Sequence, residues 1–328
     1  MELPWLESFA RNWRSRALQG RVPHAVLLQG TSGVGKRAAA AWLAAEKIKP
    51  GAASAAPQFP PAFPEHADLR WIAPPQDKHV IGVDAIRGLV DDLSLTSYEG
   101  GGKVAVIEPA NAMTVNAANS LLKTLEEPPG DTLLILVADN VGRIPATILS
   151  RCQRIIIGVP ATSESLAWLA KLHPGDNWAE ALRLAGNAPL AAIQAAENLE
   201  LTRAMAREFA ALPQSGASPL DVAAKWSKQQ PQFVLDWLGA EVRDCICRLL
   251  AGAASARKTV VPDSVLRCID RRKLFCYLDI INRLRNQPAG SFNVQLTVES
   301  LLIDWADGLR DCDRMGDFAN RSLNFGLR

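Results

Sequence analysis

A glycine-rich segment near the start of the chain has the residue types and the spacing to bind phosphate. Residues 30–36 read Gly-Thr-Ser-Gly-Val-Gly-Lys. In such a loop the glycines let backbone N–H groups wrap a triphosphate, and the lysine reaches its outer phosphates. The residues that we expect to contact a nucleotide are Gly30, Gly33, Gly35 and Lys36.

Two positions depart from an active nucleotide-hydrolysing loop. Arg37 stands where a serine or threonine hydroxyl would bind Mg²⁺, and an arginine cannot ligate a cation. Residues 103–107 read as a buried strand that runs into Glu108 and Pro109, and proline has no group that could act as general base. We therefore expect the loop to be kept as a folding element, with little or no nucleotide use and no cofactor.

The elements that must position these residues alternate between strand and helix as far as residue 159. The predicted strands are residues 25–29, 69–72, 103–107, 133–137 and 154–157. The predicted helices in this region include residues 4–19, 37–48, 83–93 and 116–125. Such alternation favours a parallel sheet with helices on both faces and a ligand site at the carboxyl ends of the strands.

After residue 160 the strand signal ends and helical spacing continues, so the chain divides into three predicted domains. Residues 1–159 form a P-loop α/β domain with a parallel sheet. Residues 160–198 form a small helical lid domain, and residues 199–328 form an all-α domain. Residues 49–64 hold five prolines and no periodicity, which predicts an irregular surface insertion.

Composition excludes several classes of protein. With 48% hydrophobic and 21% charged residues, the chain can bury a core and is not a disordered tail. The six cysteines form no Cys-x-x-Cys pair, which argues against a zinc site. Apolar runs fall far short of the roughly 18 residues of a membrane span. We therefore expect a cytoplasmic protein with reduced thiols and no membrane contact.

The net charge of +2 supplies no general attraction to nucleic acid, so such contacts would need a local patch. One basic cluster lies in and just after the predicted first helix. Its members are Arg11, Arg14, Arg16 and Arg21. They could face phosphate or form a solvated helix face, and the sequence leaves both readings open.

Two strings in the α/β region carry the most specific pattern. Residues 119–129 read Asn-Ser-Leu-Leu-Lys-Thr-Leu-Glu-Glu-Pro-Pro, and residues 144–152 read Ile-Pro-Ala-Thr-Ile-Leu-Ser-Arg-Cys. By themselves they indicate a helix that ends at the two prolines, then a strand and a turn that exposes Arg151. One interpretation of Arg151 is a surface salt bridge. Together with residues 4–6, 22–25 and 82–87, they resemble the clamp-loader ATPases of the AAA+ class, and within that class the delta-prime subunits of bacterial DNA polymerase III.

The resemblance implies that Arg151 is an arginine finger, inserted in trans into the ATP site of a neighbouring subunit. Ser150 and Cys152 would hold the turn at that interface. We expect no nucleophilic role for Cys152, because no histidine lies near it in sequence. Active members also carry a second sensing arginine in the lid, where this chain has Pro189. The resemblance therefore implies a stator that does not hydrolyse ATP.

The resemblance also implies the partners. They are the delta and gamma/tau subunits of a hetero-pentamer, joined by collar helices to which residues 199–328 are similar. That complex opens the sliding clamp and loads it on primed DNA. Although it belongs to a nucleotidyltransferase, the DNA polymerase III holoenzyme, this chain is expected to have neither ATPase nor polymerase activity. Many family members carry a four-cysteine zinc module after the P-loop helix, but residues 49–64 contain no cysteine, so we expect no zinc.

Two other functions remain alternatives at the level of sequence. A self-contained ATPase motor subunit would use Lys36 and Glu108 for its own turnover, and a hydroxyl at position 37 with a glutamate at position 109 would favour it. A nucleotide kinase would need basic lid residues and a phosphoacceptor pocket, for which the sequence has no motif.

Overall fold

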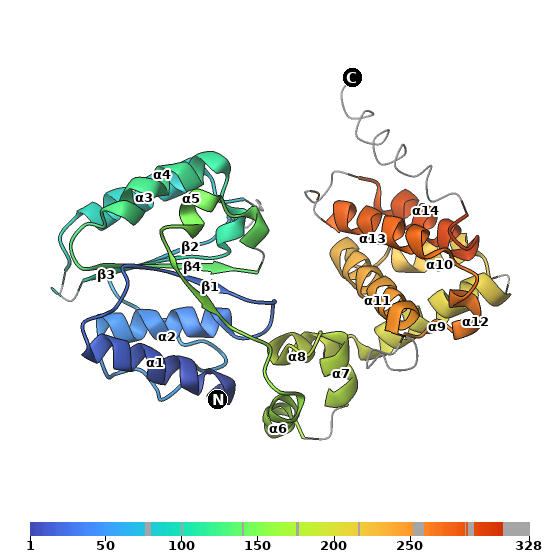
Figure 1. The fold of residues 1–328 in the computed structure, drawn as a ribbon, viewed down its shortest axis with the longest axis horizontal. Coiled ribbons are helices and arrows are strands. Elements are labelled where there is room, and N and C mark those ends of the chain that lie inside the picture. The colour runs from blue at the N-terminus through green and yellow to red at the C-terminus, as the bar shows by residue number, and fades with distance from the viewer. Residues whose placement is uncertain are drawn as a thin grey trace. The chain divides into compact units, whose positions relative to one another are not determined.

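The computed structural model divides the chain into two compact units, Met1–Glu197 and Asn198–Arg328 (Figure 1). The structure describes residues 1–75, 80–98, 100, 102–139, 141–174, 177–215, 217–251, 259–285, 287 and 292–310. Among these residues, buried apolar side chains form two clusters in the first unit and one in the second.

One parallel sheet organises the first unit. Its strands are β1 (Ala25–Gln29), β2 (Leu69–Ile72), β3 (Lys103–Ile107), β4 (Thr132–Ala138) and β5 (Gln153–Ile156). Their order across the sheet is β2-β3-β4-β1-β5, and every neighbouring pair is parallel. In this register Val26 lies opposite Ile135 on one side and Gln153 on the other. Each strand lies within one residue of its predicted position.

Helices cover both faces of this sheet, which explains why its central strands are apolar except for Gln29, Lys103 and Thr132 at their ends. The elements on one face are the 3-10 turn η1 (Pro4–Leu6), α1 (Glu7–Leu18) and α2 (Lys36–Ile48). Those on the other face are α3 (Val83–Ser94), α4 (Val115–Glu126) and α5 (Ala146–Leu149) (Figure 1). Along β1, Val26 and Leu28 enter the core beneath α2, while Ala25 and Leu27 enter the core beneath α3 and α4.

Three further helices complete the first unit. They are α6 (Thr162–Leu172), α7 (Trp178–Leu184) and α8 (Pro189–Glu197). The indole N–H of Trp168 donates to the Glu2 carbonyl oxygen at 2.9 Å, and the Trp168 ring packs edge-on against Trp5 with centroids 5.4 Å apart. The helical segment is therefore held against the N-terminal turn, beside the glycine-rich loop.

The proline-rich segment 49–64 is irregular, as predicted, but it does not lie wholly on the surface. Ala56 has no exposed surface, and the Leu3 N–H donates to the Pro57 carbonyl oxygen at 2.8 Å. The prediction of a surface insertion is wrong at these residues, because the N-terminal segment pairs with them and covers them.

Arg14 joins this segment to two helices. Its guanidinium donates to the Glu46 carboxylate at 3.1 Å and to the Ala53 carbonyl oxygen at 2.8 Å. It also lies 5.1 Å from the centre of the Trp42 ring. Arg14 is therefore bound within the chain and is not simply part of a solvated helix face.

The regular secondary structure described in the second unit is all helical. Its helices are α9 (Leu199–Ser215), α10 (Pro219–Trp226), α11 (Pro231–Ala251), α12 (Asp263–Leu266), α13 (Arg271–Arg285) and α14 (Val294–Ala306). Its core stacks Phe209 on Trp305 at 4.2 Å, and the Trp305 indole donates to the Phe209 carbonyl oxygen at 3.0 Å. The predicted fold class, a P-loop α/β domain followed by helical parts, is confirmed. Within the described ranges, no helix is long and apolar enough to cross a membrane.

Candidate functional site

The loop between β1 and α2 depends on its glycines. Gly33 and Gly35 have positive φ values of +83° and +100°, which L side chains rarely adopt. Gly30 has no room for a side chain, because a Cβ there would lie 2.2 Å from the Ile157 carbonyl oxygen. The loop follows the carboxyl end of β1, which is where open parallel sheets place their ligand sites.

The charge of Lys36 is compensated within the chain. Its side chain is only 5% exposed, and Nζ lies 2.5 Å from Oδ1 of Asp139. Nζ also donates to the Thr31 carbonyl oxygen at 2.7 Å. An ammonium has three N–H donors, so two of them already have partners in the loop and at the end of β4. Sequence reasoning missed Asp139, although a polar residue directly after a buried strand is the same signal that identified Glu108.

Arg37 lies against the carboxylate at the end of β3. Its Nε is 3.3 Å from Oε2 of Glu108, and its guanidinium lies 5.1 Å from the Phe63 ring and 5.9 Å from the Trp71 ring. The Trp71 indole N–H donates to the same carboxylate oxygen at 3.2 Å. The acidic group that would help to hold a metal ion is therefore already bound by an arginine cation.

Sequence reasoning missed Phe63 and Trp71 for different reasons. Phe63 lies in the proline-rich segment, where no periodicity indicates a role. Trp71 reads as an apolar residue of β2, and only the sheet order brings it beside β3.

Burial raises the pKa of the Glu108 carboxyl above its ordinary value of 4.5. The Arg37 cation and the Trp71 hydrogen bond oppose this effect by stabilising the charged form, whereas the negative charge of Asp139 adds to it. Lys36, Asp139, Arg37 and Glu108 thus form a compact network of alternating charges at the carboxyl edge of the sheet.

Helix α8 closes the loop from the side of the lid. The Leu190 N–H donates to the Gly33 carbonyl oxygen at 2.9 Å. A Cβ at Gly33 would lie 2.5 Å from the Ala191 Cβ, so the two backbones approach as closely as a glycine allows. Pro189, where the resemblance expects an arginine, begins this helix and is buried.

The N-terminal turn closes the loop from a second side. The Trp5 indole donates to the Val34 carbonyl oxygen at 2.9 Å, and the side chains of Leu3 and Leu6 pack against Gly35. The cavity that remains beside the loop has a volume of about 220 Å³. That is below the range of about 300–1,000 Å³ usual for small-molecule pockets. Its lining residues are Ser32, Gly33, Gly35, Lys36, Arg37, Glu108, Pro109, Val137, Asp139 and Leu190.

Arg151 lies in the turn between α5 and β5, where Glu126 holds it. Nε donates to Oε1 of Glu126 at 2.8 Å, and a second guanidinium nitrogen donates to the same oxygen. The third nitrogen donates to the Thr147 carbonyl oxygen at 3.0 Å and to Oγ of Ser150 at 3.3 Å. Cys152 is buried, and burial raises the pKa of its thiol to about 11. The chain therefore contains the surface salt bridge that the sequence offered as one reading of Arg151.

The glycine-rich loop and Arg151 lie at opposite ends of the strands. The loop, Glu108 and Asp139 follow the carboxyl ends of their strands, whereas Arg151 precedes the amino end of β5. β1 has five residues, so at about 3.3 Å per residue the amino and carboxyl ends of the strands are about 15 Å apart. Arg151 is therefore too far from the glycine-rich loop of its own chain to contact a phosphate bound there.

Comparison with known proteins gives consistent matches, some of which cover most of the chain. A protein family described as DNA polymerase III, delta subunit, matches residues 5–160. DNA polymerase III subunit delta′ of Pseudomonas aeruginosa is 32% identical over 336 residues, which is 92% of this chain and 97% of that protein. The delta′ subunit of Escherichia coli is 30% identical over 247 residues, covering 73% of each chain.

A solved structure from Thermotoga maritima, of a protein related to the gamma subunit of DNA polymerase III, aligns with 93% of this chain and all of its own. The alignment has a TM-score of 0.49 and 20% sequence identity.

Proposed function

Because this chain belongs to the delta-prime family of DNA polymerase III subunits, we propose that it acts as the stator of a clamp loader and supplies Arg151 to the ATP site of a neighbouring subunit. Its partners are the delta and gamma/tau subunits of a hetero-pentamer. That assembly works in the cytoplasm, opens the sliding clamp and loads it on primed DNA.

One observation carries the proposal. At the phosphate loop, Lys36 is paired with Asp139 and Arg37 with Glu108. Arg151, which is partly exposed, lies at the opposite end of the strands of the same sheet. This arrangement supports a subunit that holds no ATP and no resident metal of its own but can serve the ATP of another.

The chemistry of Arg151 suits this role. A guanidinium presents its N–H donors in a planar fork that matches phosphate oxygens, and it offsets charge that develops during phosphoryl transfer. To do so, Arg151 must leave Glu126. Both side chains are partly exposed, so the pair contributes little free energy and the exchange of partners costs little.

The test is Arg151→Ala in the complex reconstituted with the gamma/tau and delta subunits, clamp and primed DNA. We expect the ring to assemble and hydrolysis at the one ATP site facing this chain to fall by about 10³-fold or more, as for other arginine fingers. In a single-turnover assay, a fraction of the bound ATP then stays unhydrolysed. Glu126→Gln is the matched control, because it removes the intrachain partner and keeps the guanidinium. Unchanged hydrolysis by an assembled Arg151→Ala complex contradicts the finger role.

A second assay distinguishes the stator from a self-contained ATPase. The isolated chain is expected to show no ATP hydrolysis above that of Lys36→Ala, which controls for contaminating enzymes. Turnover that Lys36→Ala abolishes would replace the stator with a motor subunit.

A further inference from the structure

β5 is the last strand of the sheet and pairs with β1 on one side. Among the residues that the structure describes, no strand pairs with its outer edge. The Ile157 N–H donates to the Gln29 carbonyl oxygen, at 2.8 Å, and backbone groups alternate along a strand. Those of Arg154 and Ile156 therefore point away from β1, and within the described ranges they make no backbone hydrogen bond. Such an edge is a template for another strand.

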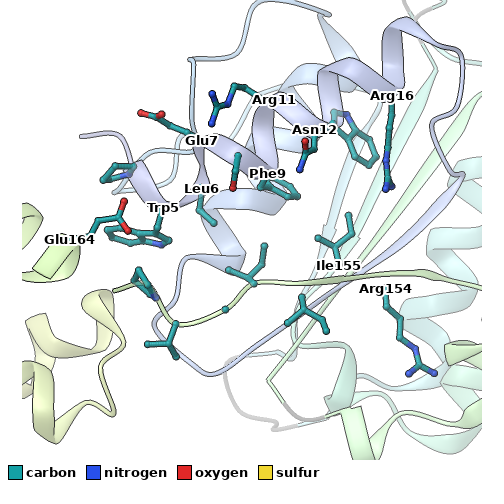
Figure 2. A pocket seen from close by; sticks show the side chains of 18 of the residues that line it. Trp5, Leu6, Glu7, Phe9, Arg11, Asn12, Arg16, Arg154, Ile155 and Glu164 are labelled. Atoms are coloured by element: carbon teal, nitrogen blue, oxygen red, sulfur yellow. The ribbon is translucent and has the colours of Figure 1, made fainter. Parts of the chain in front are cut away.

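A groove runs along this edge. It has a volume of about 700 Å³ and lies between β5, the segment that follows it and one side of α1 (Figure 2). That volume is within the range of binding pockets. Trp5, Phe9 and Ile155 contribute apolar surface. Ile156 and Val159 also line the groove, and they are 72% and 44% exposed. Covering these side chains would remove apolar area from water.

Three arginines at the groove have no partner in the described part of the chain. Arg11 and Arg16 come from α1 and Arg154 from β5, and their guanidinium groups form no ion pair or hydrogen bond there. Arg14 on the same helix, in contrast, is paired with Glu46. Figure 2 shows Glu164 toward one end of the groove and both Arg16 and Arg154 toward the other, with the Arg154 side chain pointing away from α1. The groove thus has a basic end and an acidic end.

We infer that this groove binds an extended peptide segment of a partner protein, which adds to β5 as a further strand and carries acidic side chains at the end of the groove where Arg16 and Arg154 lie. Strand addition uses the backbone groups of the edge for affinity and the side chains around it for specificity. The occupant has apolar residues at alternate positions, which cover Ile156 and Val159, and carboxylates at the basic end. This binding goes beyond the proposed clamp-loader function and does not involve Arg151.

The same observations disfavour a nucleic-acid strand in the groove. Phosphates would meet the arginines, but the outward carbonyl oxygens of Arg154 and Ile156 would face other oxygens. A peptide offers N–H donors to those carbonyls and apolar side chains to Ile156, so it satisfies the edge, the apolar surface and the charges together.

The experiment begins with a phage-displayed library of random peptides, selected on the full chain. We expect enriched sequences with apolar residues at alternate positions and acidic residues at one end. The enriched peptide is then synthesised with a fluorescent label, and its affinity is measured by anisotropy. Arg16→Ala and Arg154→Ala should each weaken binding about tenfold, because each removes a charge-assisted hydrogen bond. Arg87→Ala, an exposed arginine on α3, is the matched control and should bind normally.

The strand geometry is tested by Ile156→Pro. Proline removes an outward N–H that β1 does not use, and edge strands tolerate proline. We expect binding to be lost in Ile156→Pro and kept in part in Ile156→Thr, which retains the N–H. Thermal unfolding followed by circular dichroism shows whether Ile156→Pro is folded. If it is not, the two arginine variants and a peptide N-methylated at alternate residues decide the matter.

Three results would overturn the proposal. The selection could enrich no such pattern, or the enriched peptide could bind the arginine and proline variants as tightly as the parent chain. Alternatively, Arg16→Ala and Arg154→Ala could weaken binding of a labelled primed DNA duplex and leave the peptide unaffected, which would assign the groove to phosphate. Arg151→Ala should not change peptide binding, so a failure here is distinct from a failure of the finger role.

Discussion

At the scale of single residues, Glu108 has competing influences on its charge. Burial favours the neutral carboxyl, whereas Arg37 and Trp71 favour the carboxylate, and the net effect is a raised pKa. A carboxyl whose pKa is higher in the folded chain than in the unfolded chain binds more protons when folded. Its contribution to stability is therefore present at low pH and is lost as pH rises through the folded pKa.

Glu108→Gln should remove this part of the pH dependence. We expect the parent chain to lose stability relative to the variant as pH rises above 4.5, the ordinary value for this carboxyl. Urea unfolding of both proteins at a series of pH values measures the difference. The exposed Glu65→Gln serves as the control. A stability difference for Glu108→Gln that stays constant or grows in the opposite direction with pH would contradict the assignment.

The cysteines differ in their expected reactivity. Burial raises the pKa of Cys152 to about 11 and that of Cys245 to about 12, whereas Cys268 and Cys276 are exposed. Because the thiolate is the reacting form, iodoacetamide near neutral pH should modify the two exposed cysteines well before Cys152 and Cys245. Mass spectrometry of tryptic peptides measures the order, with urea-unfolded protein as the control. Rapid labelling of Cys152 in the folded chain would mean that its turn opens.

At the scale of elements, helix α8 packs directly against the glycine-rich loop. This packing depends on Gly33, whose missing side chain leaves room for Ala191. The loop and the lid are therefore one packed structure, and a change in the loop acts on the helix.

Gly33→Ala should destabilise the first unit by about 2–4 kcal/mol. About 1–2 kcal/mol comes from the positive φ of Gly33, and the remainder from crowding against Ala191. Gly51→Ala is the control, since Gly51 has a φ of +78° and nothing within 4 Å of its Cβ position. Urea unfolding of both variants separates the two contributions. Equal losses in the two variants would show that α8 moves aside without cost.

How much of the fold and of the candidate site could be predicted from the sequence depends on how far apart in the chain the interacting residues are. The strands and the glycine loop follow from runs of a few residues, and the structure contains them. Partners far apart in sequence carry no such signal: Arg151 meets Glu126 across 25 positions, and Trp71 meets Glu108 across 37. Sequence reasoning therefore named the ends of these networks, and only the packing of the sheet supplied their counterparts.

At the scale of the whole molecule, the buried clusters separate along the chain. Both clusters of the first unit end before residue 198, and that of the second begins at Met205. Each unit thus has the apolar interior that independent folding requires.

Residues 1–197 expressed alone should consequently fold and unfold cooperatively. Circular dichroism and tryptophan fluorescence through a urea titration test this, and coincident transitions are the expected result. The full chain provides the comparison. A fragment with no cooperative transition would mean that the first unit needs the second for its stability.

The opposite positions of Arg151 and the glycine-rich loop on one sheet give the molecule a direction. Subunits that donate from one end of the sheet and receive at the other associate head to tail. A complete cycle of arginine-to-ATP contacts needs every member to do both. Under the proposed function, this chain can donate but has nothing for another arginine to serve. Under that proposal it stands at one terminus of the series of arginine-to-ATP contacts, which therefore has two unlike ends and a fixed order of members.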